Sequence, residues 1–463
     1  MTSPLPPLDD YLQANSAKFE AELCELLRIP SVSADEAYAK DVRRAAGWVA
    51  DQLSGLGLAT EIVQTPGHPI VVASSQHQPG KPTVLVYGHY DVQPPDPLDE
   101  WTTPPFEPTA RDGNLYARGA TDDKGQMFTH IKSAEAWIKT AGELPLNLKY
   151  LIEGEEEVGS EHLDKFIAEH KERLACDCIV ISDSSQFGPG MPAITYGLRG
   201  IAYYELRVTG PKQDLHSGTF GGGVMNPAIA LAKVLSAMID EHGRIQLPGY
   251  YDQVVPLSDE ERRQFAALPF DERKFQEKLG VPALAGEEGF TTLERRWARP
   301  TFDINGLWSG YQGQGAKTVL PAKAGAKFSF RLVPKQDPAK LTAALRKFIE
   351  ERCPPGVRWE LIDMHGAPGV VACLDSPYMA AAGRAIELGF GKAPVLIREG
   401  GSIPVVNTFH DLLGVDTLLL GWGLDDDNTH SPNEKFCLAD FHRGIRASAY
   451  LWDELSQMAK DQA

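Results

Sequence analysis

Residues 82–91 read PTVLVYGHYD: a proline, an apolar run, a glycine, and then a histidine and an aspartate. An apolar run of this length between proline and glycine is typical of a strand buried on both faces of a parallel sheet. Three further segments have the same form, with polar residues soon after the apolar run: residues 146–157 (LNLKYLIEGEEE), 178–183 (CIVISD) and 417–430 (TLLLGWGLDDDNTH). We therefore expect four buried strands of one sheet.

Helical patterns lie between these strands. Apolar residues recur at helical spacing over residues 16–28, and the same criteria predict helices over residues 41–54, 124–141, 161–173 and 377–389. Strands that alternate with helices predict an α/β fold with a mostly parallel sheet covered on both faces. Because this pattern stops near residue 200 and returns after residue 365, we predict one discontinuous main domain made of residues 1–200 and 366–463.

The intervening residues 201–365 have a different pattern. Strands are expected over residues 200–210, 326–334 and 357–363, and helices over residues 226–239 and 338–351. Two strand–helix–strand units of this kind predict an inserted α+β domain of ferredoxin-like form with one open sheet face. Residues 244–317, rich in charge, proline and glycine, are expected to form an irregular elaboration of that domain.

The composition excludes several classes of partner. The 463 residues include 45 Lys and Arg against 63 Asp and Glu, a formal net charge of −18. Nucleic acids and anionic membranes bind basic surfaces, so we expect neither as a partner. The first residues, MTSPLPPLDDYLQ, do not have the basic and apolar regions of a signal peptide, and the longest apolar runs are too short to cross a bilayer. The six cysteines form no dense framework, which favours reduced thiols and a cytoplasmic protein.

The polar residues that follow the four strands indicate a metal site. The carboxyl ends of parallel strands meet at one edge of a sheet, where ligands bind. The candidates at this edge are His89, Asp91, Glu155–Glu157, Asp183 and His430, and the glycine-rich loop RGATDDKGQ (118–126) adds Asp122 and Asp123. Divalent metals bind such mixtures of imidazole and carboxylate, and one bridging carboxylate would let these residues hold two ions. Of the pair Glu156–Glu157, one would serve as ligand and the other as general base.

Each of these segments also has a simpler interpretation. Glu155–Glu157 could be a solvated charge run and Asp122–Asp123 a turn. His89 could be a strand-end histidine with its hydrogen bonds satisfied, and His430 a surface histidine. The metal-site interpretation depends on the agreement among segments, because together they supply a full ligand set.

Eight motifs, in this order along the chain, resemble those of the carnosinase-like cytosolic dipeptidases. They are YGHYDVQP (87–94), LYARGATDDKG (115–125), EGEEEVGS (153–160), SD (182–183), DLHSG (214–218), FSFRLVP (328–334), REGGSIPV (398–405) and THSPNE (429–434). These dipeptidases belong to a two-metal superfamily that also contains aminoacylases and bacterial glutamate carboxypeptidases. The resemblance extends from about residue 20 to residue 450. The chain departs from many relatives at Tyr90 and in the acidic run 425–427, and both departures could tune substrate choice.

The resemblance implies two divalent metal ions per subunit, Zn²⁺ or Mn²⁺. Asp122 would bridge the ions, His89 and Asp183 would complete one site, and Glu157 and His430 would complete the other. Glu156 would be the general base, and Asp91 would orient the His89 ring. The Asp122–Asp123 peptide bond would be cis, as in relatives.

The resemblance also implies that residues 201–365 act as a lid and as the interface of a homodimer. His216 would reach into the partner subunit's site and stabilise the oxyanion of the tetrahedral intermediate, and Thr318 would contact the substrate across the dimer. Arg331 would bind the C-terminal carboxylate of the substrate, with Ser402 beside it and His365 near the lid hinge. On their own, Arg331 could form an ion pair on a strand face, His216 could belong to a turn, and Ser402 could be a loop hydroxyl.

We therefore predict a dinuclear metal-dependent hydrolase, a metallopeptidase that cleaves dipeptides or similar small peptides with a free C-terminal carboxylate. An N-acyl amino acid deacylase or a carboxypeptidase would use the same two-metal chemistry and stays an alternative. A non-catalytic metal-binding or scaffold dimer is a third interpretation. The sequence speaks against it, because the ligands and the general base are all present.

Overall fold

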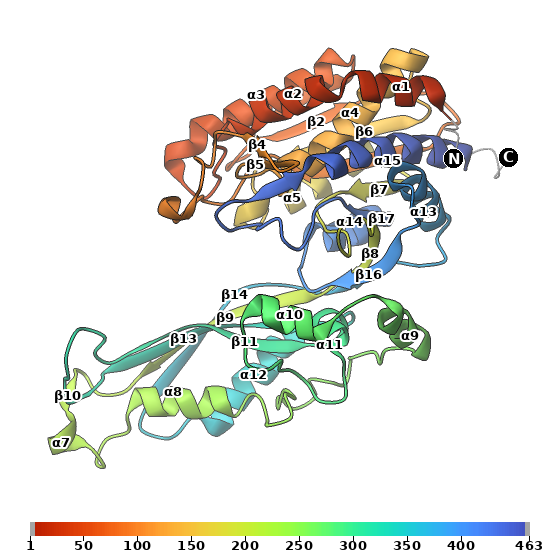
Figure 1. Cartoon of the computed structure of the whole chain (residues 1–463). Coiled ribbons are helices and arrows are strands. Elements are labelled where there is room, and N and C mark those ends of the chain that lie inside the picture. Colours follow the sequence, from red (N-terminus) through yellow and green to blue (C-terminus); the bar gives the residue numbers. More distant parts are fainter. Residues whose placement is uncertain (1–4, 459–463) are drawn as a thin grey trace. The chain divides into compact units, whose positions relative to one another are not determined.

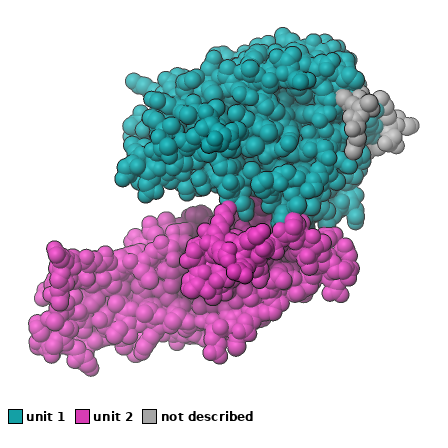
Figure 2. All heavy atoms as spheres, viewed as in Figure 1, with its two compact units in different colours: residues 1–196, 372–397, 408–463 teal, residues 197–371, 398–407 magenta. Residues whose placement is uncertain are grey.

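The computed structural model describes residues 5–458, and its internal contacts divide the chain into two compact units (Figure 2). The first unit comprises residues 1–196, 372–397 and 408–463, and the second comprises residues 197–371 and 398–407. Segment 398–407 is thus counted with the second unit, whereas the sequence pattern assigned it to the first. The division into a catalytic domain and a lid domain stays a prediction.

The first unit is built on a large sheet with the strand order β1-β2-β6-β3-β7-β17-β8 (Figure 1). The strands are β1 (Ala59–Val63), β2 (Ile70–Ser74), β3 (Thr83–His89), β6 (Asn147–Glu153), β7 (Cys178–Ile181), β8 (Ala193–Leu198) and β17 (Asp416–Gly421), and β16 (Val395–Glu399) also pairs with β8. The four central strands β6, β3, β7 and β17 are parallel, and the flanking pairs are antiparallel. The predicted α/β class is confirmed, and the apolar runs quoted above form the parallel centre.

Helices cover this sheet. They are α1 (Pro6–Ala14), α2 (Ser16–Leu27), α3 (Ala39–Gly55), α4 (Lys124–Ala141), α5 (Leu163–Glu169), α6 (Lys171–Leu174), α13 (Pro377–Phe390), α14 (Val405–Leu413) and α15 (Leu438–Gln457), with short 3₁₀ turns at Glu36–Tyr38, Leu98–Glu100 and Glu156–Val158. Helix α4 contacts both β3 and α15, and it is buried without interruption from Lys124 to Ala136. A helix enclosed in this way gives a fixed position to the loop that precedes it, which carries Asp122.

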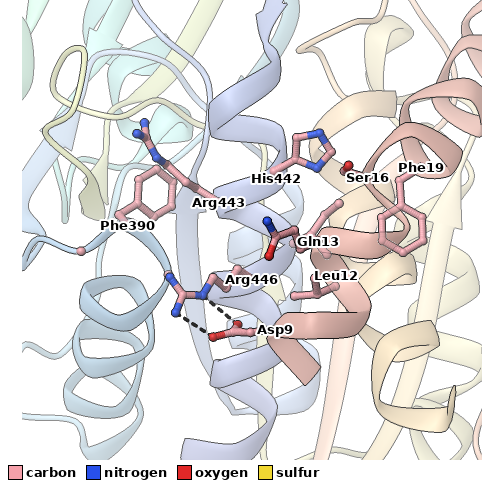
Figure 3. A pocket seen from close by; sticks show the side chains of 12 residues that line it. Asp9, Leu12, Gln13, Ser16, Phe19, Phe390, His442, Arg443 and Arg446 are labelled. Carbon is pink, nitrogen blue, oxygen red and sulfur yellow. Dashed lines mark hydrogen bonds and ion pairs between the residues drawn. The ribbon is translucent and has the colours of Figure 1, made fainter. Parts of the chain in front are cut away.

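An ion pair joins α1 to α15. Arg446 donates from Nε and from Nη2 to the two carboxylate oxygens of Asp9, each at 2.9 Å (Figure 3). Tyr450 donates its hydroxyl proton to the same carboxylate at 2.9 Å. A cavity of about 550 Å³ lies beside the pair, lined by residues of α1, α2, α13 and α15. These contacts hold together segments 437 residues apart in the sequence, so the first unit is compact although it is discontinuous along the chain.

The second unit has the chain order β9 (Gly200–Thr209), α8 (Pro227–Ser236), β11 (Thr301–Ser309), β13 (Lys323–Leu332), α12 (Pro338–Arg352) and β14 (Arg358–Ala367). The strand order is β11-β13-β9-β14, with all pairs antiparallel. This βαββαβ connection confirms the predicted ferredoxin-like form. The inward side chains of β13, such as Phe328 and Phe330, form one core with α8 and α12. Because side chains alternate along a strand, Arg331 points away from that core.

Residues 244–317 contain more regular structure than we expected. They form the helices α9 (Asp259–Ala267), α10 (Glu272–Leu279) and α11 (Thr292–Ala298), and the edge strand β11. Ser258 and Thr291 begin α9 and α11 with capping boxes, in which Glu261 and Glu294 return the hydrogen bond. The expectation of an irregular stretch was wrong, because helices of seven to nine residues make only about two turns and therefore show little hydrophobic periodicity.

The remaining strands are short. β10 (Leu215–His216) pairs with β12 (Val319–Leu320) ahead of the short helix α7 (Ser217–Phe220), and β4 (Thr109–Arg111), β5 (Asn114–Tyr116) and β18 (Lys435–Cys437) form a three-stranded sheet. β15 (Val370–Val371) pairs with Gly197 and Leu198 at the end of β8. Within residues 5–458, no helix is both long and apolar enough to cross a bilayer. The six cysteines are free thiols.

Candidate metal centre

The carboxyl ends of the parallel strands carry the predicted ligands. β3 ends at His89, and Asp183 follows the end of β7 by two residues. Glu157 lies in the 3₁₀ turn after β6, and His430 lies in the loop between β17 and β18. Asp122 comes from the loop before α4. Five segments that are distant in sequence therefore converge at one edge of the sheet.

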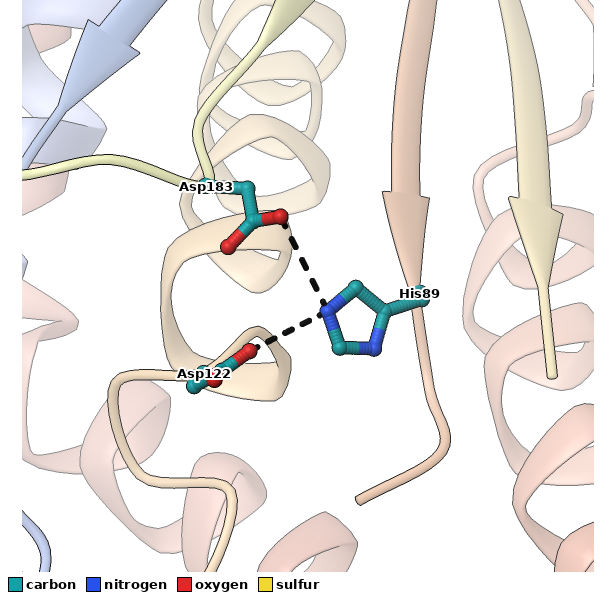
Figure 4. Close-up of side chains that lie close together, drawn as sticks. All are labelled: His89, Asp122 and Asp183. Carbon is teal, nitrogen blue, oxygen red and sulfur yellow. Dashed lines mark ion pairs between the residues drawn. The ribbon is translucent and has the colours of Figure 1, made fainter. Parts of the chain in front are cut away.

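The first group of potential ligands consists of His89, Asp122 and Asp183, whose ligand atoms all lie within 4.8 Å of one another. His89 Nε2 lies 3.2 Å from Asp122 Oδ1 and 4.0 Å from Asp183 Oδ2, with both carboxylates facing the same ring nitrogen (Figure 4). His89 is fully buried, and the two carboxylates are 15% and 16% exposed. The group is therefore open to solvent on its carboxylate side only.

The second group consists of Asp122, Glu157 and His430, which satisfy the same distance criterion. His430 Nε2 lies 2.9 Å from Asp122 Oδ2 and 3.3 Å from Glu157 Oε2. Gln93 donates to Glu157 Oε2 at 2.8 Å and fixes that carboxylate. Asp122 is common to both groups, and each of its oxygens faces a different histidine. This is the geometry that a bridging carboxylate requires.

The donor set fits a binuclear metal site. His89 Nε2 is buried and has no hydrogen bond of good geometry to a described residue, although two carboxylates lie within 4.0 Å. Burial and the charges of Asp122 and Asp123 raise the pKa of Asp183 well above its ordinary value. Burial and Asp122 likewise raise the pKa of Glu157. Divalent cations would relieve this repulsion, and imidazole and carboxylate are ligands that such cations accept.

Asp91 contacts one residue of each ligand group, His89 and Glu157. His89 Nδ1 lies 3.1 Å from the backbone oxygen of Asp91 and 3.3 Å from its Oδ1, so Nε2 is turned toward the cluster. Asp91 Oδ2 accepts a hydrogen bond from the backbone N–H of Glu157 at 3.1 Å. The cis peptide bond that the resemblance implied is present between Asp122 and Asp123.

The three glutamates of residues 155–157 have different surroundings. Glu155 is buried, accepts a hydrogen bond from His68 N at 3.1 Å, and lies 2.8 Å from His162 Nδ1. Burial raises the pKa of Glu156 to about 7, and the charges of Glu157 and Asp122 contribute in the same direction. Glu157 belongs to the second ligand group. The run is therefore not a solvated charge run.

The second unit brings together three of the predicted substrate-binding residues. Arg331 Nη1 donates to Ser402 Oγ at 3.0 Å, and Ser402 donates to the backbone oxygen of Arg199 at 2.5 Å. His365 stacks on Tyr203 at 5.3 Å between ring centroids. Burial lowers the pKa of His365, and the charge of Arg331 acts in the same direction.

His216 and Thr318 form a separate pair in the β10–β12 region. Ser217 N donates to the Thr318 backbone oxygen at 3.1 Å. His216 Nδ1 accepts hydrogen bonds from Gly218 N and Thr219 N at 3.1 and 3.2 Å. Because Nδ1 is an acceptor, the ring proton of neutral His216 resides on Nε2, which is then a donor.

Two buried carboxylates near the ligands, Asp427 and Glu434, were not among the predicted site residues. Both are 0% exposed, and both hydrogen-bond the loop that carries Asp122. Asp427 lies in the acidic run that we expected to tune substrate choice, and Glu434 closes the THSPNE motif. Tyr90, the other departure, is buried and donates to the Pro69 backbone oxygen at 2.5 Å, so its side chain has no exposed surface in this structure.

Comparison with known proteins gives one consistent result. Residues 85–454 match Peptidase family M20/M25/M40. The Cys-Gly metallodipeptidase of Candida albicans is 37% identical over 468 residues, which cover 96% of each chain. The solved structure of human carnosine dipeptidase 1 is 33% identical, with a TM-score of 0.85 and coverage of 98% of this chain and 99% of that chain. The M20 family metallo-carboxypeptidase of Sulfolobus solfataricus is 32% identical, with a TM-score of 0.86 and coverage of 95% and 99%.

Proposed function

The chain belongs to Peptidase family M20/M25/M40, and on this premise we propose that it hydrolyses dipeptides, or similar small peptides, that have a free C-terminal carboxylate. It is a metal-dependent peptidase with a binuclear metal site. The observation that carries the proposal is the position of Asp122, whose two oxygens face the two histidines of adjacent ligand groups. Relatives that align over nearly the whole chain are named as dipeptidases, which supports the substrate class.

The residues around the site would have different roles in hydrolysis. Bound divalent ions would supply Lewis-acid chemistry, lowering the pKa of a water molecule and polarising the scissile carbonyl. We assign Glu156, next to the ligand Glu157, as the general base that takes a proton from the attacking water and returns it to the leaving amine. Asp91 holds the His89 ring through Nδ1 and keeps Nε2 directed at the cluster.

We propose Zn²⁺ or Mn²⁺ as the metal. Each ligand group offers one histidine and two carboxylates, with Asp122 shared between them. Both ions accept such mixed nitrogen and oxygen ligands, whereas a site for Ca²⁺ would be formed by oxygen atoms.

Arg331, with Ser402, is our candidate for binding the C-terminal carboxylate of the substrate. Its guanidinium is partly buried, and its hydrogen bond to Ser402 is to a neutral group, so the positive charge is available to an anion. A guanidinium can hold a carboxylate through two parallel hydrogen bonds. His365 lies in the neighbouring strand β14 and completes this subsite in the proposal.

We propose a homodimer in which His216 and Thr318 act on the substrate of the partner subunit. Arg331 lies eight residues beyond Lys323, the start of β13, while the β10–β12 pair precedes that start. At about 3.3 Å per residue, a strand of this length separates the two groups by roughly 25 Å. A dipeptide is too short to contact both groups of one protomer, so a second protomer would supply one of them.

The edge strand β11 supports this dimer. Ile304, Leu307 and Trp308 of β11 are 43%, 59% and 38% exposed. A groove of about 560 Å³ lies between this strand and α8, and apolar side chains form most of its lining. An exposed apolar edge strand is a site for pairing with another strand. A second copy of β11, related by a two-fold axis, would pair the backbone N–H and C=O groups that each edge leaves unpaired.

A carboxypeptidase or a deacylase of N-acyl amino acids is the second candidate. The similarity to the metallo-carboxypeptidase of Sulfolobus solfataricus favours it, because the same chemistry would act there on a different acyl group. We also propose a cytoplasmic location, which the six free cysteines support.

A substrate panel tests the proposed function. Chelator-stripped protein is assayed with and without added Zn²⁺ or Mn²⁺ on Cys-Gly, carnosine, their C-terminal amides and N-acetyl amino acids. We expect metal-restored cleavage of the free dipeptides and loss of cleavage on amidation, because the amide removes the charge that Arg331 would bind. Cleavage of the N-acyl compounds alone would assign the protein to the second candidate, and cleavage without metal would contradict the metal centre.

A further inference from the structure

Glu434 accepts four hydrogen bonds from the loop that carries Asp122. Its Oε2 accepts from Arg118 Nη1 at 2.8 Å and from Gly119 N at 3.0 Å. Its Oε1 accepts from Thr121 N at 3.0 Å and from Asp122 N at 3.2 Å. Three of these donors are the backbone N–H groups of Gly119, Thr121 and Asp122. One buried carboxylate therefore holds the backbone of the loop up to Asp122 itself.

A second buried carboxylate strengthens the same connection. Asp427 Oδ2 lies 3.0 Å from the Thr121 hydroxyl and accepts from Leu424 N at 2.8 Å. Lys435 donates to Asp427 Oδ1 at 2.9 Å. The Thr121 hydroxyl also lies 2.6 Å from the Lys435 backbone oxygen. The loop before α4 is therefore bound from both ends of the segment 427–435.

The segment 427–435 also carries the ligand His430, and part of its backbone is left-handed. Asn428, His430 and Asn433 have φ values of 56°, 61° and 61°. Residues other than glycine rarely adopt this conformation unless surrounding contacts hold them there. The buried carboxylates of Asp427 and Glu434 lie on either side of these three residues and bind both ends of the segment to the loop that carries Asp122.

We propose that Glu434 is a positioning residue of the metal centre, which sets Asp122 relative to His430 so that Asp122 can serve both ligand groups. The inference rests on the metal site of the proposed function and adds a residue that touches neither ion nor substrate. Because Asp122 belongs to both groups, displacing its backbone weakens both ion sites together. A change in a ligand of one group only, such as His430→Ala, weakens mainly one ion site.

The test measures Zn²⁺ binding rather than turnover. Wild-type chain and the Glu434→Gln variant are stripped with chelator and titrated with Zn²⁺ against a fluorescent competitor, and bound zinc per chain is measured after dialysis. Glutamine keeps one carbonyl oxygen and turns an NH₂ group toward the remaining donors. We expect the affinity to fall about 10–100-fold at both sites, as for other residues that orient metal ligands.

Two further variants separate positioning from general stability. Glu135 is a buried carboxylate of α4 that accepts from Tyr11, Lys18 and Lys132 and lies outside the ligand groups. We expect Glu135→Gln to lower the melting temperature of the metal-free protein and to leave Zn²⁺ affinity unchanged. Thr121→Val replaces the hydroxyl that bonds Asp427 and the Lys435 backbone oxygen by a methyl group of similar size, and we expect it to fold and to lose Zn²⁺ affinity at the lower end of the same range, about 10-fold.

The outcomes discriminate between the inference and its premise. Unchanged Zn²⁺ affinity in Glu434→Gln and Thr121→Val, with two zinc ions in the wild type, would overturn the inference and leave the proposed function intact. An equal loss of affinity in Glu135→Gln would assign the effect to stability and would also overturn it. A wild-type chain that binds no Zn²⁺ would overturn the metal centre, and the inference with it.

Discussion

His130 is a fully buried histidine outside the ligand groups, in the middle of α4. Its Nε2 lies 2.8 Å from Ser182 Oγ, and its Nδ1 makes no hydrogen bond to a described residue. Burial lowers the pKa of His130 to about 3. A histidine in an unfolded chain has a pKa near 6.5, so the folded and unfolded states differ in proton binding over a wide range below neutral pH.

We predict that His130 makes the protein less stable as the pH falls from 6.5 toward 3. Because the folded pKa is lower than the unfolded one, the contribution to stability is complete above pH 6.5 and is lost as the unfolded state takes up its proton. Between pH 6.5 and 4.5 the free energy of unfolding should fall by about 2 kcal/mol more in the wild type than in His130→Gln. Urea unfolding of both proteins across this range measures the difference, and identical pH dependence would show that folding does not lower the pKa of His130.

The ligands that lie at or soon after the end of a strand were the simplest to predict from the sequence. His89, Asp183 and Glu157 lie at the end of a buried strand or within four residues of it, so the rule that parallel strands end at one edge was enough to predict that they converge. Glu434 could not be assigned a role in this way, because three of its four partners are backbone N–H groups, which have no sequence signature.

At the scale of elements, β11 is a strand that the alternation of apolar and polar residues does not predict. The strand has exposed residues on both faces, and its register shifts between Ile304 and Gly306 at a bulge, so apolar and polar residues do not alternate regularly. Strand β13, its neighbour, was predicted because every second residue from Ala326 to Leu332 is apolar, and these residues lie in the core. A strand at the edge of a sheet thus has the weakest sequence signal. In our proposal the same strand, β11, forms the dimer interface.

We predict that Leu307→Asp converts the proposed dimer to a monomer. A charge on the edge strand opposes burial of the apolar side chains around it and pairing with a second edge. Sedimentation or light scattering should report the mass of one chain. The matched control is Ile62→Asp, since Ile62 is a 37% exposed apolar residue on β1, an edge strand of the first unit. A dimeric Leu307→Asp variant would exclude β11 from the interface.

At the scale of the whole molecule, the proposal requires that one active site be assembled from two chains. Glu156 belongs to the first unit and His216 to the second. If His216 acts on the partner's substrate, no single chain has a complete site, and activity depends on protein concentration.

We predict that two inactive variants, Glu156→Ala and His216→Ala, regain activity when mixed and allowed to exchange subunits. In a mixed dimer one site combines an intact Glu156 with an intact His216, so about a quarter of all sites should be complete at equal amounts. Turnover of Cys-Gly before and after exchange measures this. If mixed dimers form and remain inactive, His216 does not act on the substrate of the partner subunit. As a control, we expect both variants to bind about as much metal as the wild type.

The metal ligands also lie far apart in the order of synthesis, since His89 and His430 are separated by 430 − 89 = 341 residues. A ribosome that adds about 5–20 residues per second needs roughly 20–70 seconds to make that interval. Throughout this time the nascent chain has the first ligands but not the loop that completes the second group. The peptidase therefore emerges as an incomplete enzyme and cannot form the second ligand group until His430 has been made, which limits any cleavage during its own translation.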